Sequence, residues 1–257
     1  MLIGFCSGMS LFAQTPPIAP VVAHHETRHG TAVSDDYFWL REKSNPQVIR
    51  YLEAENAYTA AMTKGLKPFE DALYKEMLSH IKQADLSVPV RRGGYYYYSR
   101  SEEGKQYPIE CRKKGSLEAK EEVLLDLNEL GKGRNFVGLG AFVVSDDQNL
   151  LAYTLDYVGY RQFTLHVKDL RGGATLPDTI ERVDSVAWAA DNETLFLVTD
   201  DAVTKRPNRA LRHTLGQNGF EPLYEEKDET FQISMQKTRD KRYLLLSAES
   251  TDTTEFR

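Results

Sequence analysis

The spacing of apolar residues changes from helical to strand-like at about residue 88. Between residues 48 and 62, apolar side chains recur every three or four positions, which predicts an amphipathic helix of about four turns. Asn45-Pro46 is a typical helix start, with a capping side chain followed by proline at the first helical position. Lys64-Gly65 is a typical end. The same spacing predicts a second helix over residues 68–81.

From about residue 88, short apolar runs alternate with turns, and the pattern repeats. An Asp-containing turn followed by an apolar strand occurs at residues 147–153, 191–197 and 240–246. A spacing of about 44 to 49 residues, with about four strands in each unit, is the signature of β-propeller blades. Asp and Asn suit such turns because they tolerate left-handed backbone.

The repeat predicts blades at residues 88–130, 136–177 and 182–225, and a fourth blade that begins near Thr230. Propellers close into a ring with four to eight blades, whereas the sequence up to Arg257 contains about three and a half. An open arc leaves strand edges unpaired and apolar faces uncovered. We therefore expect a mainly β fold, an incomplete propeller behind a helical lead-in, that needs more chain after Arg257.

The first residues form a short apolar segment. Residues 2–13 read LIGFCSGMSLFA, and Pro16-Pro17 follow soon after. This arrangement is typical of a secretory signal cleaved after Ala13, so we assign residues 1–14 as a signal peptide. The protein would then be periplasmic or secreted, and without a signal it would be cytoplasmic. No Lys or Arg precedes the segment, so an apolar N-terminus without fixed structure stays open as the alternative.

Composition excludes some partners. The 257 residues carry 32 basic and 38 acidic side chains, a net charge of −6, which argues against nucleic acid as a partner. No apolar run reaches the length of roughly 18 residues that would span a membrane. The two cysteines, Cys6 and Cys111, imply no disulfide framework, and Cys111 is expected to be a buried or half-buried thiol.

Several motifs resemble a known family. The motif DDYFWLR at residues 35–41, preceded by His29-Gly30, resembles the N-terminal signature of the prolyl oligopeptidase family. Other segments, which together extend the likeness over about residues 16–257, resemble oligopeptidase B within that family. These segments are YLEAENAYT at 51–59, YYYSR at 96–100, EGKQYPI at 103–109, Cys111-Arg112, LDLN at 125–128, Trp188-Ala189 and RHTLG at 212–216.

The resemblance implies a two-domain serine peptidase in which a seven-bladed propeller caps an α/β-hydrolase domain and limits access to short peptides. It implies that residues 15–83 pack on the hydrolase domain and that residues 84–257 are about three and a half of the expected seven blades. The partners would be short peptide substrates and the protein's own C-terminal hydrolase domain, which this chain lacks. Oligopeptidases B cleave after Arg or Lys, and relatives cleave after Pro.

The catalytic residues of the family are not expected in this chain. Peptide hydrolysis of this type needs a Ser, His and Asp triad, and in α/β-hydrolases the serine lies in a Gly-x-Ser-x-Gly turn. No such string occurs, since Ser7-Gly8 lacks the spacing. We therefore assign no catalytic, cofactor-binding or metal-binding residue, and no cofactor. The 257-residue chain alone is expected to be inactive and to fold poorly or aggregate.

Histidines and aromatic residues offer other candidate sites. His24, His25 and His29 surround Glu26, but their spacing matches neither a helical zinc motif nor a zinc finger. His166 and His213 are interpreted as strand residues with one hydrogen-bonded nitrogen, and not as catalytic bases.

Aromatic and basic clusters are interpreted in the same structural way. The run Tyr95–Tyr98 could stack nucleic-acid bases, but packing is favoured, with two rings inward and two outward. Arg91-Arg92 and Arg112-Lys113-Lys114 are interpreted as solvated turns or as contacts to the absent domain.

Three functions stay open. The first is a serine oligopeptidase, which predicts downstream sequence with a Gly-x-Ser-x-Gly string followed by Asp and His. The second is a non-catalytic propeller that binds peptides or proteins, which predicts no hydrolase domain after Arg257. The third is cleavage after proline, against which the motifs between Tyr51 and Arg112 argue.

Overall fold

A computed structural model describes residues 15–257, which divide into two compact units. The first unit ends at Lys82, and the second runs from Gln83 to Arg257. The predicted signal peptide, residues 1–14, lies outside the described residues. No helix in the described part of the chain is long and apolar enough to cross a membrane.

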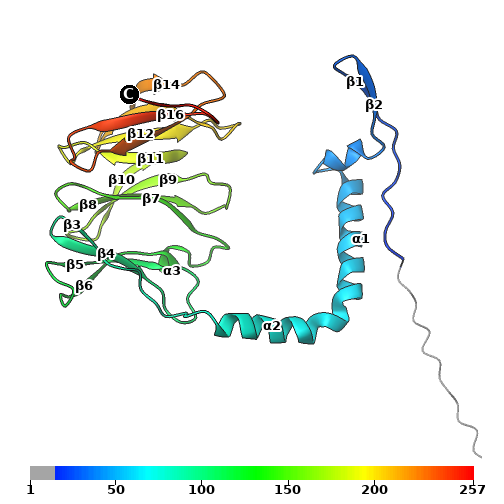
Figure 1. Ribbon diagram of the computed structural model, residues 1–257, viewed down its shortest axis with the longest axis horizontal. Coiled ribbons are helices and arrows are strands. Elements are labelled where there is room, and N and C mark those ends of the chain that lie inside the picture. Colours follow the sequence, from blue (N-terminus) through cyan, green and yellow to red (C-terminus); the bar gives the residue numbers. More distant parts are fainter. Residues whose placement is uncertain (1–14) are drawn as a thin grey trace, which may run out of the picture. The chain divides into compact units, whose positions relative to one another are not determined.

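The first unit holds a β-hairpin and two α-helices (Figure 1). Asn45 caps the first α-helix as predicted, because its Oδ1 accepts a hydrogen bond from the backbone N–H of Gln47. The hairpin was not predicted, and His29-Gly30 form its turn with positive φ angles of 51° and 82°. The elements are β1 (His25–Arg28), β2 (Thr31–Ser34), η1 (Phe38–Arg41), α1 (Pro46–Thr63), η2 (Lys64–Leu66) and α2 (Lys67–Ser79).

The apolar faces of both α-helices are largely uncovered in this chain. In α1 only Val48 is buried, and α2 buries no side chain. We call the exposed apolar side chains of α1, α2 and the residue shortly after α2 the helical stripe: Ile49, Leu52, Met62, Phe69, Leu73, Tyr74, Met77 and Ile81. Amphipathic helices normally bury such faces against another element.

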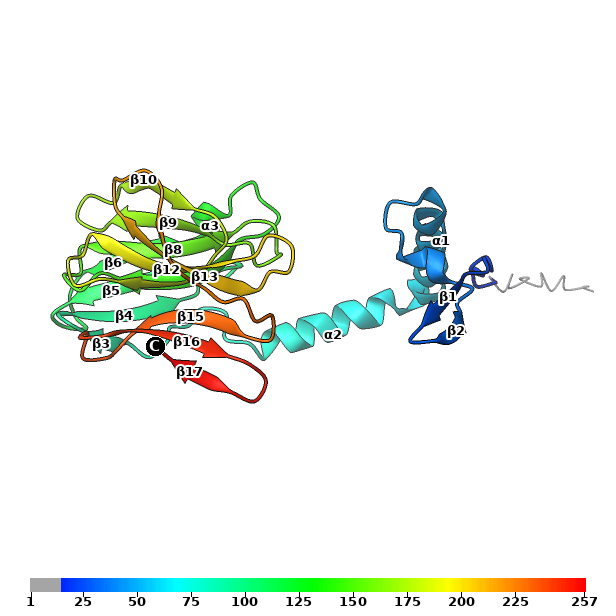
Figure 2. The same cartoon turned by 90° about the horizontal axis from the view of Figure 1, so that it is seen from above.

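The second unit consists of four antiparallel sheets, which we call blades 1 to 4 (Figures 1 and 2). In each blade the strands pair in sequence order, so every blade is a simple meander. Blade 1 holds β3 (Val90–Arg92), β4 (Tyr95–Arg100), β5 (Ile109–Lys114) and β6 (Glu121–Asp126), and α3 (Leu127–Leu130) follows it. Blade 2 holds β7 (Gly138–Val144), β8 (Leu150–Asp156), β9 (Thr164–Asp169) and β10 (Thr175–Ile180). Blade 3 holds β11 (Val183–Trp188), β12 (Thr194–Asp200), β13 (Pro207–Thr214) and β14 (Glu221–Glu225), and blade 4 holds β15 (Gln232–Lys237), β16 (Leu244–Glu249) and β17 (Thr254–Phe256).

These sheets confirm the predicted blades, with two differences in extent. The predicted end of the second blade at residue 177 is too early, because β10 continues to Ile180. The fourth blade carries three strands, more than the half expected from the sequence.

The repeated Asp-containing turns connect the first and second strands of blades 2, 3 and 4. In each turn an aspartate carboxylate accepts hydrogen bonds from backbone N–H groups two or three residues ahead: Asp147 from Asn149, Asp191 from Glu193 and Thr194, and Asp240 from Arg242. A residue with positive φ lies in each: Gln148 at 66°, Asn192 at 59° and Lys241 at 63°. The turn chemistry therefore produces the sequence repeat.

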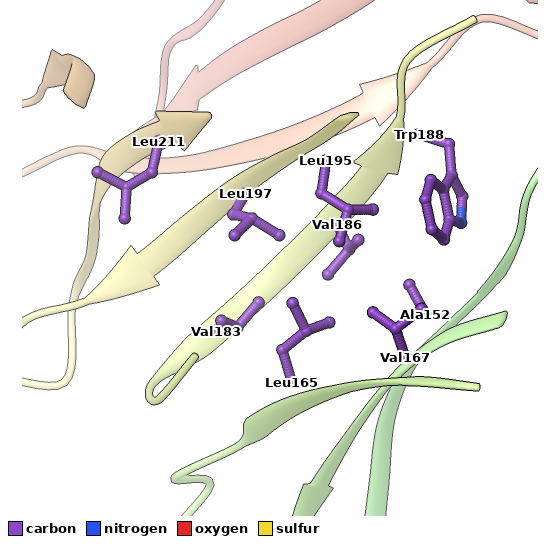
Figure 3. Close-up of a cluster of buried hydrophobic side chains, with 9 residues drawn as sticks. All are labelled: Ala152, Leu165, Val167, Val183, Val186, Trp188, Leu195, Leu197 and Leu211. Carbon is purple, nitrogen blue, oxygen red and sulfur yellow. The ribbon is translucent and has the colours of Figure 1, made fainter. Parts of the chain in front are cut away.

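Apolar side chains between neighbouring blades form the core. Figure 3 shows the cluster between blades 2 and 3, in which Ala152, Leu165 and Val167 face Val183, Val186, Trp188, Leu195, Leu197 and Leu211. Trp188 is 2% exposed, and its Nε1 donates a hydrogen bond to the backbone oxygen of Val143 in blade 2, at 2.8 Å. Contacts of this kind remove apolar surface of both sheets from water and so stabilise the packing of neighbouring blades.

Blade 1 contains the buried thiol that the sequence predicted. Cys111 is 1% exposed and packs with Tyr98 and Ile109. Burial raises the pKa of the Cys111 thiol to about 11. The thiol therefore stays protonated at neutral pH, which suits a packing role.

Candidate binding cavity on the first strands

An open cavity of about 840 Å³ lies along the first strands of blades 1, 2 and 4. It is lined by β3 and the neighbouring parts of β4 and β5, by the end of β7 with the turn that follows it, and by the end of β15 with its turn. We call it the first-strand cavity, and the side chains that matter for its chemistry are Val90, Arg91, Arg92, Tyr97, Glu110, Phe142, Val143, Val144, Asp146, Gln148, Lys237, Arg239 and Lys241.

Asp146 joins blade 2 to blade 4 across this cavity. Its carboxylate accepts a hydrogen bond from Lys237 and forms an ion pair with Lys241 at 3.1 Å. Burial alone would raise the pKa of Asp146, but the two ammonium groups outweigh burial and lower it. One carboxylate therefore serves two lysines.

The other basic groups of the cavity have no acidic partner within hydrogen-bond or ion-pair distance among the described residues. Arg91 and Arg92 are exposed on β3, and Arg239 is exposed in the turn after β15. Glu110 is the second acid of the cavity, and burial raises its pKa. Five basic groups thus face two acids in a chain whose net charge is −6.

Apolar and aromatic side chains make up the remaining wall. Phe142, Val143 and Val144 come from the end of β7, and Val90 comes from β3. The hydroxyl of Tyr97 donates a hydrogen bond to Oε1 of Gln148, which joins the wall of blade 1 to the first turn of blade 2. A cavity with this mixture of apolar walls and a few charged groups is suited to an extended ligand with a charged end.

The tyrosine run lies on β4 and packs largely as predicted. Tyr98 is buried and donates a 2.5 Å hydrogen bond to Glu121. Tyr95 and Tyr97 have ring centroids 6.2 Å apart, as expected for side chains on one face of a strand. Tyr95 to Tyr97 are half-buried.

The two arginine clusters lie on strands and not in turns, so this part of their interpretation was wrong, and a contact to the absent domain stays a prediction. Arg91-Arg92 lie on β3, and the turn is formed by the glycines that follow them. Arg112 lies on β5 and is 3% exposed. Its guanidinium donates to Glu122 and to the backbone oxygen of Gln148, both at 2.7 Å, and stacks 4.0 Å from the Tyr95 ring. The side chain is buried because it joins blades 1 and 2.

Both ring nitrogens of His213 have an acceptor within hydrogen-bond distance, where the prediction gave one hydrogen-bonded nitrogen. Nδ1 lies 2.8 Å from the backbone oxygen of Gly219, and Nε2 lies 2.9 Å from Oδ1 of Asp178. Asp178 belongs to β10 of blade 2, so the pair joins two blades. Both partners are acceptors, and the tautomer of the imidazole decides which ring nitrogen donates. His166 is half-buried against Tyr153, and burial lowers its pKa.

The histidines near the N-terminus are dispersed around the hairpin of the first unit. His24 stacks on Phe38 with ring centroids 3.7 Å apart, and His25 is exposed. Glu26 pairs with Arg28, and His29 lies in the turn. Within residues 15–257, no group of three or more His, Cys, Asp or Glu side chains is arranged to hold a metal ion.

Comparisons with known proteins define the class. Residues 16–257 match the family model described as "Prolyl oligopeptidase, N-terminal beta-propeller domain". The chain therefore belongs to the prolyl oligopeptidase family, a family of serine peptidases, and forms part of its propeller region. The structure of oligopeptidase B from Leishmania major matches 94% of this chain, with a TM-score of 0.85 and 30% sequence identity, and the match covers 37% of that protein.

Curated relatives are much longer than this chain. Dipeptidyl aminopeptidase BI of Pseudoxanthomonas mexicana is 38% identical over 98% of this chain, and the match covers 38% of that protein. Protease 2 of Moraxella lacunata is 33% identical over 93% of this chain, and the match covers 36% of that protein. The chain thus spans little more than a third of the relatives that it matches.

Proposed function

We propose that this chain is the N-terminal propeller part of a serine oligopeptidase that cleaves short peptides after Arg or Lys. The observation that carries the proposal is the family match over residues 16–257, together with the structural similarity to oligopeptidase B. The propeller limits the substrates to short peptides. The chemistry belongs to a C-terminal hydrolase domain, and this chain alone is inactive.

The helical stripe supports the proposed partner domain. Phe69 is 67% exposed, Tyr74 65% and Met77 60%, all on α2. A helix that leaves such a face in water gains little from folding, so the face suits burial against another domain. A hydrolase domain of the same protein supplies that surface.

Release of dipeptides is a second candidate activity. It is favoured by the name of the Pseudoxanthomonas mexicana relative, a dipeptidyl aminopeptidase with 38% identity. The prolyl endopeptidase of Elizabethkingia meningoseptica is 24% identical, which supports cleavage after proline less. A non-catalytic, peptide-binding propeller is the remaining alternative.

Export to the periplasm or medium is part of the proposal and depends on the signal at residues 1–14.

A panel of fluorogenic peptides tests the specificity on the complete gene product. N-terminally blocked peptides with Arg or Lys before the scissile bond are expected to give kcat/KM values at least about 100-fold above those for Pro or Ala, because a site that pairs with a cation rejects neutral side chains. Cleavage restricted to unblocked substrates would favour dipeptide release. Cleavage after Pro, or no cleavage at all, would contradict the proposal.

A further inference from the structure

We propose that the first-strand cavity binds the carboxylate groups of peptides, so that the propeller itself favours peptides with acidic side chains or a free C-terminus. The inference rests on the proposed function for the choice of peptides as the ligand class. It adds a binding site within the propeller, separate from the hydrolysis that the proposal assigns to another domain.

The charge of the cavity is the first argument. Lys237 and Lys241 share the single carboxylate of Asp146, so their positive charge is only partly compensated. Arg91, Arg92 and Arg239 also line the cavity, and their guanidinium groups have no acidic partner among the described residues. A guanidinium matches a carboxylate with two parallel hydrogen bonds, and such charge-assisted pairs are stronger than neutral ones.

The contrast with the rest of the molecule is the second argument. Exposed strand arginines elsewhere in the propeller have partners: Arg209 pairs with Glu225 at 3.2 Å, and Arg212 pairs with Glu221 at 2.5 Å. Within residues 15–257 the arginines of β3 have no such partner, although the chain as a whole is acidic. A local positive field inside a concave surface attracts anions in particular, because the walls limit screening by water.

The shape of the site favours a peptide over a small inorganic anion. A volume of about 840 Å³ exceeds what one phosphate or sulfate ion fills. The wall at Phe142, Val143 and Val144 offers apolar contacts beside the charges. In addition, β3 is the end strand of its sheet, and residues 90–93 of this strand and its turn line the cavity. Backbone groups at a free strand edge can pair with an extended peptide.

Binding is tested on the complete gene product after treatment with diisopropyl fluorophosphate, which prevents turnover by a reactive serine. Three fluorescent peptides of equal length are titrated by fluorescence polarisation: one with Glu side chains and an amidated C-terminus, one neutral with a free C-terminus, and one neutral and amidated. The first two distinguish side-chain from terminal carboxylates. An oligonucleotide of the same net charge as the Glu peptide is titrated beside them.

The double variant R91Q/R92Q is compared with R209Q/R212Q, which removes the same charge from a strand outside the cavity. We expect at least one carboxylate-bearing peptide to bind about 10-fold more tightly than the neutral amide at low salt, and R91Q/R92Q to abolish that preference. R209Q/R212Q should retain it.

Equal affinity for all three peptides, equal loss in both variants, or tighter binding of the oligonucleotide would overturn the inference. A preference that depends on Arg91 and Arg92 supports the inference even where no substrate is cleaved, so its failure and that of the proposed peptidase are distinguishable.

Discussion

Replacement of Trp188 by alanine is expected to lower the free energy of unfolding by about 3 to 5 kcal/mol, the usual cost of emptying a buried aromatic site. Trp188 is 2% exposed and lies in the cluster between blades 2 and 3. The substitution also removes the hydrogen bond from its Nε1 to the Val143 oxygen, leaving that carbonyl without this donor. No other large side chain in the cluster combines apolar packing with a bond between blades.

Urea unfolding of the complete gene product, followed by circular dichroism, measures this effect. The control variant is Tyr243→Ala, since Tyr243 is 58% exposed. Its midpoint should move little, because little packing is lost. A Trp188→Ala midpoint equal to the wild-type value would show that the junction between blades 2 and 3 does not contribute to the stability of the unfolding unit.

Replacement of Asp178 by asparagine is expected to cost about 1.5 to 3 kcal/mol at neutral pH, the usual contribution of hydrogen bonds to a charged group, because it removes a buried carboxylate that is hydrogen-bonded in the fold. Asp178 and His213 are both buried, and their contact joins blades 2 and 3. The same oxygen of Asp178 accepts a 2.7 Å hydrogen bond from the backbone N–H of Gly216. The variant therefore weakens two contacts of one buried group.

The pKa of Asp178 determines the direction in which its contribution to stability changes with pH. Burial alone would raise the pKa of Asp178, but the Gly216 N–H and the His213 ring outweigh burial and lower it. A lowered pKa means that the carboxylate stabilises the fold above its unfolded value of about 4, and that this contribution is lost as pH falls from there through the folded pKa.

Midpoints of urea unfolding between pH 3 and pH 7 test whether this contribution is lost as the pH falls. Asp178→Asn should be less stable than wild type at pH 7, and the difference should shrink as pH falls below about 4. The control is Asp252→Asn, which changes an exposed side chain. A constant difference between Asp178→Asn and wild type over the whole pH range would contradict the role given to the charged carboxylate of Asp178.

Local chemistry explains why much of the fold could be predicted from the sequence. Asn45-Pro46 defines the start of α1 by a side-chain hydrogen bond and a fixed φ angle, both of which are local. The turns at Asp147, Asp191 and Asp240 are also closed by near neighbours in sequence. Repetition of these local signals makes the number and spacing of the blades visible before any tertiary contact is known.

The candidate cavity could not be predicted because its residues come from distant strands. Lys237 and Asp146 are 91 positions apart and meet only because the first strands of blades 2 and 4 lie near each other. The pair Arg91-Arg92 does not by itself indicate the cavity that the two residues line. Arg112 was misjudged for the same reason, since its partner Gln148 belongs to the next blade. The sequence feature that does indicate a positively charged site is the basic run around the turn after β15, which holds Lys237, Arg239, Lys241 and Arg242.

Labelling of the complete gene product with a fluorophosphonate probe, followed by mass mapping of the modified residue, tests the central claim most directly. The account predicts one modified serine, in a Gly-x-Ser-x-Gly string encoded downstream of Arg257, and no modified residue within residues 15–257. A gene product that takes up no probe, or a modified serine within the propeller, would contradict the assignment of this chain as the propeller part of a serine oligopeptidase.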